Sequence, residues 1–146
     1  MAETSHTKLR MLISDIMTAE VITAKPSDSI GDALSLLEDL DIRHLPVVTQ
    51  GQLVGLVSDR DLREYRLPVM QELEHPDEAD TLLATPIAEL MNKTIISVYA
   101  NEKVKVAIDL MLEYQIGAIP VLDRHQEKLV GIISYIDILR AVRHSL

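Results

Sequence analysis

The strongest constraint on the fold is that the chain repeats itself. Residues 13–48 align with residues 87–122 without a gap, at a constant offset of 74 positions. Every Ile, Leu, Val and Met of the first segment aligns with an apolar residue of the second. The identical pairs are Ile13/Ile87, Met17/Met91, Ile22/Ile96, Ala33/Ala107, Leu36/Leu110, Ile42/Ile116, Pro46/Pro120 and Val47/Val121. After a turn that is two residues longer in the second copy, LVGLVSDRDL matches LVGIISYIDI. The chain is therefore a duplication of one structural unit.

Both copies predict the same order of elements. An apolar turn precedes a short strand at residues 21–23 and 95–97, and a hairpin follows at 45–58 and 119–134. Between strand and hairpin, apolar residues at i, i+3, i+4 and i+7 predict a helix with one buried face. These residues are Ile30, Ala33, Leu34 and Leu37 in the first copy, and Val104, Ala107, Ile108 and Met111 in the second. Ser27 and Asn101 are the expected N-caps. With a last helix after each hairpin, the prediction is an α+β fold of two βαββα repeats packed sheet to sheet.

The repeats set the expected domain organisation. We expect a disordered tail at residues 1–8, a first repeat at 9–66, an acidic linker containing prolines at 67–86, and a second repeat at 87–146. One copy of about sixty residues buries too little surface to be stable alone. The two copies are therefore expected to share a core.

Composition excludes several classes of function. A net charge of -9, with 3% aromatic residues and neither Trp nor Phe, argues against nucleic-acid binding. The apolar runs are too short to span a bilayer, and no signal peptide is evident. The absence of Cys fits a reducing cytoplasm and excludes thiolate chemistry. The five His residues show no metal-ligand spacing, and no nucleophile is placed beside a base. We expect no enzyme activity, no metal and no cofactor.

One polar motif ends each hairpin. Its pattern is Gly-x-x-Ser-x-x-Asp, formed by Gly55, Ser58 and Asp61 and by Gly131, Ser134 and Asp137. Ser followed three residues later by an acid is typical of a capping box that starts a helix. A capping box favours the longer Glu or Gln, however, and an Asp between strand and helix can also bind the two hydroxyls of a ribose. Both interpretations remain open from the spacing.

The repeated pattern of VIT, helix, LPVV and LVGLVSDRDL resembles the CBS motif, and the pair resembles a CBS tandem or Bateman module, especially the acetoin-utilisation type. The resemblance implies pseudo-two-fold symmetry and two clefts between the repeats. Such clefts hold AMP, ADP, ATP or S-adenosylmethionine as regulatory ligands. By the resemblance, Asp61 and Asp137 would bind ribose, Ser58 and Ser134 phosphate or sugar oxygens, and Ile22 and Ile96 the adenine faces. Backbone groups of Arg43, His44, Pro46, Gly117, Ala118 and Pro120 would bind the adenine edge.

The two copies differ where a ligand would bind. Arg43 and His44 of the first copy correspond to Gly117 and Ala118, and Arg60 corresponds to Ile136. Arg60 is a candidate phosphate ligand, and so is Arg43, although a solvated role suits Arg43 equally well. We therefore expect two unequal sites in a regulatory module. Apolar residues beyond the buried face of each helix, together with the resemblance, predict a homodimer. They are Leu36 and Leu40 in the first copy and Leu110 and Leu112 in the second. An unidentified regulated protein is a possible further partner, and a scaffold without ligand is the alternative function.

Overall fold

The computed structural model describes residues 11–40, 42–63 and 76–146. The predicted tail at residues 1–8 and the linker residues 67–75 lie outside the described residues. Contacts divide the chain into two compact units. One is Ile22–Ile95, and the other joins the residues up to Val21 with Ile96–Leu146. We name them the Asp61 unit and the Asp137 unit after the acid of each Ser-x-x-Asp motif.

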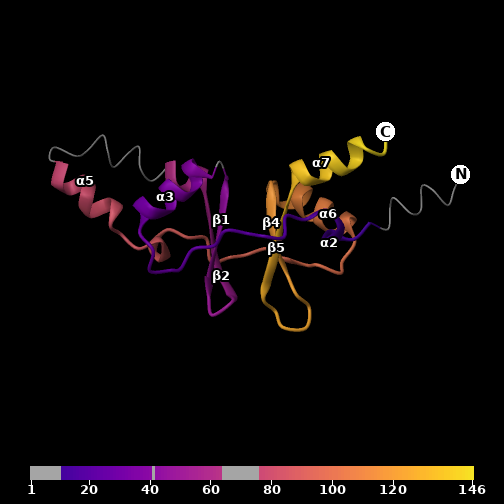
Figure 1. Cartoon of the computed structure of the whole chain (residues 1–146), viewed down its shortest axis with the longest axis horizontal. Helices are drawn as coiled ribbons and strands as arrows, with labels where there is room; N and C mark the ends of the chain where they lie inside the picture. The colour runs from indigo at the N-terminus through magenta and orange to yellow at the C-terminus, as the bar shows by residue number, and fades with distance from the viewer. Residues whose placement is uncertain (1–10, 41, 64–75) are drawn as a thin grey trace, which may run out of the picture. The chain divides into compact units, whose positions relative to one another are not determined.

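The Asp61 unit is built on one hairpin (Figure 1). Strand β1 (His44–Thr49) pairs antiparallel with β2 (Gln52–Ser58), with His44 opposite Ser58. The turn between them has positive φ at both Gln50 and Gly51, as a two-residue type I′ turn requires. Helix α3 (Ile30–Asp39) packs against β1, and α5 (Pro76–Leu83) and the short η1 (Ile87–Glu89) follow later in the chain. Residues 59–63 form a helical turn directly after β2.

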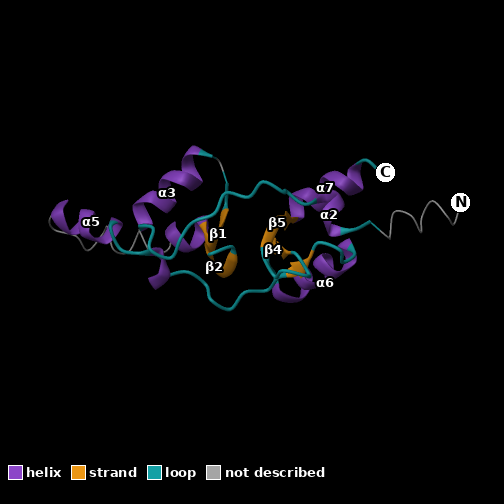
Figure 2. Ribbon diagram, turned by 60° about the horizontal axis from the view of Figure 1, so that its bottom comes forward, coloured by secondary structure: helices purple, strands orange, loops and turns teal. Residues whose placement is uncertain are grey.

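The Asp137 unit repeats this plan. Strand β3 (Val98–Tyr99) runs parallel to β4 (Ala118–Leu122), which pairs antiparallel with β5 (Leu129–Ser134). Helices α2 (Ile13–Ile16), α6 (Val104–Tyr114) and α7 (Tyr135–Arg143) lie on one side of β4 and β5 (Figure 2). The duplication and the α+β class predicted from the sequence are confirmed.

The predicted helix faces form the two cores. Ile30, Ala33, Leu34 and Leu37 are all buried, and they pack with Leu45, Val47 and Val57 of the hairpin. In α6, Ala107 and Met111 are buried, while Val104 and Ile108 pack half-buried against the core. The spacing of apolar residues therefore predicted both helices and the side that each one buries.

The compact units differ from the sequence repeats in one segment. Ile13 belongs to the first repeat, yet it is fully buried in the core of the Asp137 unit, where its N–H donates to the carbonyl of Glu102. Ile87 of the second repeat is fully buried in the core of the Asp61 unit, and its N–H donates to the carbonyl of Asp28. Each apolar turn therefore packs in the unit formed by the other repeat.

The first predicted strand of each copy is wrong in extent. Residues 21–23 form no strand, and pairing begins only at Ala24, as a single parallel bridge to Val47. The corresponding pairing in the Asp137 unit is the two-residue β3 rather than residues 95–97. The strands are this short because only Ala24 in the first copy, and only Val98 and Tyr99 in the second, pair with the first strand of the hairpin.

The predicted N-caps are also wrong. Helix α3 is capped by Ser29, whose Oγ accepts the Asp32 N–H, and α6 begins after Lys103 without a side-chain cap. An acidic side chain closes a turn before each helix, and each helix therefore begins later in the sequence than predicted. Asp28 Oδ2 accepts the Lys25 N–H at 2.8 Å, and Glu102 Oε1 accepts the Tyr99 N–H at 2.7 Å.

A matched pair of glycine substitutions tests how tightly the segments before the helices pack on the strands. A Cβ on Gly131 would lie 2.9 Å from the Thr18 carbonyl oxygen, and that backbone is bonded to Ile132 in both directions. The three atoms nearest to a Cβ on Gly55 all belong to the Met91 side chain. We expect Gly131→Ala to lower the free energy of unfolding by about 1–3 kcal/mol, and Gly55→Ala to cost clearly less. Urea unfolding of both variants checks this, and equal losses would contradict the predicted packing.

Candidate functional site

The Ser-x-x-Asp motifs form capping boxes in both units. Ser58 Oγ accepts the Asp61 N–H at 3.0 Å, and Asp61 Oδ2 accepts the Ser58 N–H at 3.3 Å. The corresponding distances for Ser134 and Asp137 are 3.2 and 2.9 Å, and the Ser134 hydroxyl also donates to Oδ2. Both aspartates reach the cap N–H although a capping box favours the longer Glu or Gln, so the capping interpretation that the spacing left open is confirmed.

Capping leaves part of each carboxylate available. The reciprocal bonds use only Oδ2 of Asp61 and of Asp137, so Oδ1 takes no part in either cap. Both aspartates and both serines are half-buried rather than enclosed. An ionised carboxylate offers about four acceptor positions. Capping and ligand binding therefore do not compete for the same oxygen.

In the Asp61 unit, a cluster of charged and polar groups forms where β1 begins and β2 ends. The Asp59 N–H donates to the Arg43 carbonyl at 2.8 Å, and the Asp59 carboxylate pairs with Arg63 at 3.0 Å. His44 is half-buried opposite Ser58. Burial lowers the pKa of His44, partly offset by Asp61 and Asp59 and reinforced by Arg43. The cluster therefore has a neutral imidazole beside the Asp61 carboxylate near neutral pH.

The Asp137 unit is more apolar at the same place. Ala118 stands opposite Ser134 and is almost fully buried, and the Gly117 carbonyl accepts the Tyr135 N–H at 2.9 Å. The ring of Tyr135 lies 3.2 Å from the position that a Cβ on Gly117 would take. Tyr135 is half-exposed, and its ring lies beside the candidate site of this unit although the predicted ligand residues do not include it. The available signal was an aromatic residue directly after the motif serine.

The remaining predicted site residues differ in how far they are exposed to a ligand. Pro46 and Pro120 are fully buried, and the Pro46 carbonyl already accepts the Ala24 N–H at 2.9 Å. Ile22 is 44% exposed, whereas Ile96 packs half-buried against the core of its unit. Arg60 is exposed in the helical turn that carries Asp61. The structure thus brings Arg43, His44, Ser58 and Asp61 together in one unit, and Gly117, Ala118, Ser134 and Asp137 in the other.

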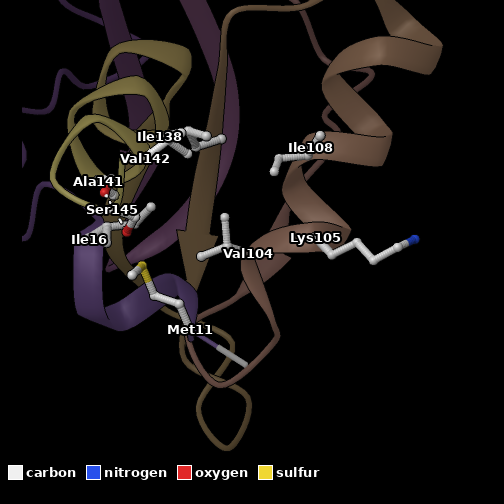
Figure 3. Close-up of a pocket in the computed structure, with 9 residues that line it drawn as sticks. All are labelled: Met11, Ile16, Val104, Lys105, Ile108, Ile138, Ala141, Val142 and Ser145. Carbon is white, nitrogen blue, oxygen red and sulfur yellow. Dashed lines mark hydrogen bonds between the residues drawn. The ribbon is translucent and has the colours of Figure 1, made fainter. Parts of the chain in front are cut away.

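A separate cavity of about 360 Å³ lies among α2, α6 and α7 (Figure 3). Its lining is mostly apolar, and the ammonium group of Lys105 points away from it and pairs with Asp109 at 2.8 Å. The residues lining it are Met11, Ile16, Val104, Lys105, Ile108, Ile138, Ala141, Val142 and Ser145. None of these belongs to the predicted ligand residues of the Asp137 unit, so the cavity is distinct from the Ser134–Asp137 motif.

No cluster of three or more His, Asp or Glu side chains in the described part of the chain could hold a metal ion. None of the helices within residues 11–40, 42–63 and 76–146 is long and apolar enough to cross a membrane.

Comparison with known families agrees with this duplicated architecture. The family model of the CBS domain matches residues 13–68 and again residues 87–144. The chain belongs to the CBS domain family. The CBS domain-containing protein YhcV of Bacillus subtilis is 31% identical over 126 residues, which cover 86% of this chain and 81% of YhcV. The resemblance stated from the sequence is confirmed.

Solved structures of CBS proteins share the fold. AcuB from Vibrio cholerae has a TM-score of 0.76 at 30% identity, covering 94% of this chain and 93% of AcuB. CBSX2 of Arabidopsis thaliana in complex with AMP has a TM-score of 0.77 at 29% identity, covering 92% and 98%. The CBS domain pair of MJ0100, in complex with 5′-methylthioadenosine and S-adenosyl-L-methionine, has a TM-score of 0.75 at 28% identity, covering 93% and 98%.

Many CBS relatives are longer than this chain. The chain spans between 22% and 46% of the length of several curated relatives, including an inosine-5′-monophosphate dehydrogenase of Methanocaldococcus jannaschii at the lower limit. In such proteins the matched region is one part of a larger chain.

Proposed function

We propose that this CBS pair is a regulatory module that binds an adenine ribonucleotide (AMP, ADP or ATP) or S-adenosylmethionine at its two Ser-x-x-Asp motifs. The observation that carries the proposal is that both motifs present a half-buried carboxylate whose Oδ1 is left out of the helix cap. The complexes of CBSX2 with AMP and of MJ0100 with S-adenosyl-L-methionine support the ligand class. Ligand binding would change the packing of the module, and a partner protein would respond to that change.

The proposed roles follow the chemistry of each group. Asp61 and Asp137 accept hydrogen bonds from ribose hydroxyls, and Ser58 and Ser134 contact sugar or phosphate oxygens. Arg60 and Arg43 supply positive charge for phosphates. Ile22 and Ile96 contact the faces of the adenine, and Tyr135 offers a further aromatic surface in the Asp137 unit. Backbone groups of residues 43–46 and 117–120 bind the adenine edge. The carbonyls among them that already accept hydrogen bonds within the fold are less available for this role.

The two sites should prefer different ligands. The Asp61 unit has Arg43, His44 and Arg60 where the Asp137 unit has Gly117, Ala118 and Ile136. A hydrogen bond to a charged group contributes about 1.5–3 kcal/mol. In calorimetric titrations we therefore expect Asp137→Asn, which leaves the Asp61 site, to bind ATP at least about tenfold more tightly than adenosine. We expect Asp61→Asn, which leaves the other site, to show a smaller difference. Equal discrimination by the two variants would contradict the assignment of the arginines.

Two rival functions make other forecasts. A scaffold with degenerate sites would show no thermal stabilisation by AMP, ATP or S-adenosylmethionine, whereas a ligand of the folded state must raise the melting temperature. An enzyme would consume the nucleotide, and prolonged incubation followed by chromatography would detect the product. We favour a regulatory role, because the Oγ atoms of Ser58 and Ser134 are engaged in helix caps. We place the protein in the cytoplasm, which its sequence without Cys fits.

We further propose that the chain forms a homodimer through the Asp137 unit. Leu139, Val142 and Leu146 are exposed at spacings of three and four residues from α7 onwards, and Leu112 of α6 is 74% exposed. Val142 also lines the apolar cavity, so the exposed side of α7 borders the cavity at this residue. A surface of this kind is typical of an interface. Light scattering should give twice the 16.3 kDa chain mass, and Leu139→Glu should give the monomer mass. A monomeric wild type at tens of micromolar would contradict the proposal.

A further inference from the structure

His44 and its neighbours Arg43 and Asp59 have no charged counterpart in the second copy, where Gly117, Ala118 and Tyr135 take their places. His44 stands opposite Ser58 in the β1–β2 ladder, and alternation along β1 places it on the opposite side from Leu45 and Val47, which pack in the core. Its counterpart in the other unit is the apolar Ala118. The Asp61 unit therefore has a titratable group beside its candidate ribose-binding acid, and the Asp137 unit has none at this position.

Three charged groups act on the His44 imidazole. Arg43 precedes it in the chain, and Asp59 and Asp61 belong to the helical turn after β2. Helix α3 also packs against β1 and turns Ile30, Ala33, Leu34 and Leu37 towards the hairpin. The segment that pairs with β1 at Ala24 carries Lys25 as the next residue. Asp59 is already paired with Arg63, and Asp61 is engaged in the cap. Burial is the largest influence on the imidazole, and it holds the pKa of His44 below its ordinary value.

An anion bound beside His44 would oppose the effect of burial and favour the protonated imidazole. A phosphate near Arg43 and Arg60 brings negative charge to a site that excludes part of the solvent, and a nearby opposite charge favours the protonated imidazole. Ribose hydroxyls are uncharged and have no such effect. The sequence difference between the two copies would then discriminate ligands by phosphate charge and by pH.

We infer that His44 is a specificity-determining residue of the Asp61 site, which takes up a proton when a phosphate-bearing ligand binds and does not do so for the uncharged nucleoside. This inference rests on the proposed nucleotide binding. By linkage, one coupled proton makes the affinity rise by at most about tenfold for each unit of decrease in pH. The Asp137 site has Ala118 at this position, so it has no imidazole there to take up a proton.

The test is calorimetry of the full chain between pH 5.5 and 7.5 in buffers of different ionisation enthalpy, a range chosen to bracket the ordinary pKa of His, about 6.5. Asp137→Asn weakens binding at the second site. In that background, the protein with His44→Gln is compared with the protein that keeps His44. We expect AMP to bind with greater proton uptake when His44 is present, and adenosine to show no difference between the two variants. The comparison at equal pH cancels the titration of the phosphate itself, whose second pKa is about 6.

The outcomes separate the two proposals. Equal proton uptake with and without His44, or a His44-dependent uptake with adenosine as large as with AMP, would overturn the role of His44 while nucleotide binding stands. Absence of binding of AMP, ADP, ATP and S-adenosylmethionine at every pH in the wild type would overturn the proposed function itself. In Asp61→Asn, which leaves only the Asp137 site, His44→Gln should not change the proton uptake.

Discussion

The double variant Asp61→Asn/Asp137→Asn is expected to lose its thermal stabilisation by AMP and by ATP while it remains folded. Each substitution should weaken adenosine-ligand binding by about 1.5–3 kcal/mol, the range for a hydrogen bond to a charged group. That loss corresponds to roughly a 10- to 150-fold increase in Kd at each site. Melting temperatures with increasing ligand concentration measure the effect, because stabilisation follows the ratio of ligand concentration to Kd.

The geometry of the caps explains why binding should be lost and the fold kept. Asn can still present its one oxygen to the N–H of Ser58 or Ser134, as Oδ2 of the aspartate does. Its NH₂ group then takes the place of Oδ1, so a donor replaces the acceptor that ribose hydroxyls need. The loss of charge at a helix start should cost at most about 1 kcal/mol of stability at each site.

Asp15→Asn is the matched control. Asp15 Oδ2 accepts the Leu12 N–H at 2.9 Å across the same three-residue spacing, but it caps α2 and belongs to neither proposed site. This variant should show a similar small loss of stability and unchanged binding of AMP and ATP. If the double variant binds both nucleotides as tightly as the wild type does, the ribose assignment is wrong and the Ser-x-x-Asp motifs serve only as helix caps.

Features that depend on neighbours in the sequence were predicted well. The hairpins follow from pairs of β-branched runs around a short polar turn, and the buried faces of α3 and α6 follow from apolar spacing of three to four residues. The structure has both at the predicted places. The start of α3 was missed by two residues because Ser27, Asp28 and Ser29 are all good capping residues. Only the turn closed by Asp28 decides that Ser29 is the cap.

Features that depend on distant contacts were not accessible to sequence reasoning. Candidate site residues could be named from the repeated motif, but the half-buried His44 beside Asp61 and the Tyr135 ring beside Gly117 emerge only when two strands meet. The same limit applies to the apolar turns. Ile13 and Ile87 are identical residues at corresponding positions, so no sequence pattern shows which core each one enters.

The last prediction follows from this exchange of turns. Ile13→Ala, a substitution in the first repeat, should destabilise the Asp137 unit, because Ile13 is fully buried among Val98, Ile119 and Ile133. Ile87→Ala, in the second repeat, should destabilise the Asp61 unit. Replacing a buried Ile by Ala costs about 2–5 kcal/mol, a large part of the roughly 5–15 kcal/mol that holds a domain folded.

Hydrogen exchange followed by mass spectrometry locates the loss. In Ile13→Ala the greater loss of protection should fall in β4 and β5, and in Ile87→Ala in β1 and β2, although each substitution lies in the other sequence repeat. Nucleotide binding should follow the same pattern, with Ile13→Ala weakening the Asp137 site more than the Asp61 site. Ile13→Val and Ile87→Val are the conservative controls, with an expected cost of about 0.5–1.5 kcal/mol. A loss of protection confined to the repeat that carries the substitution would mean that each turn packs with its own repeat, and the two cores would then follow the duplication boundary instead of crossing it.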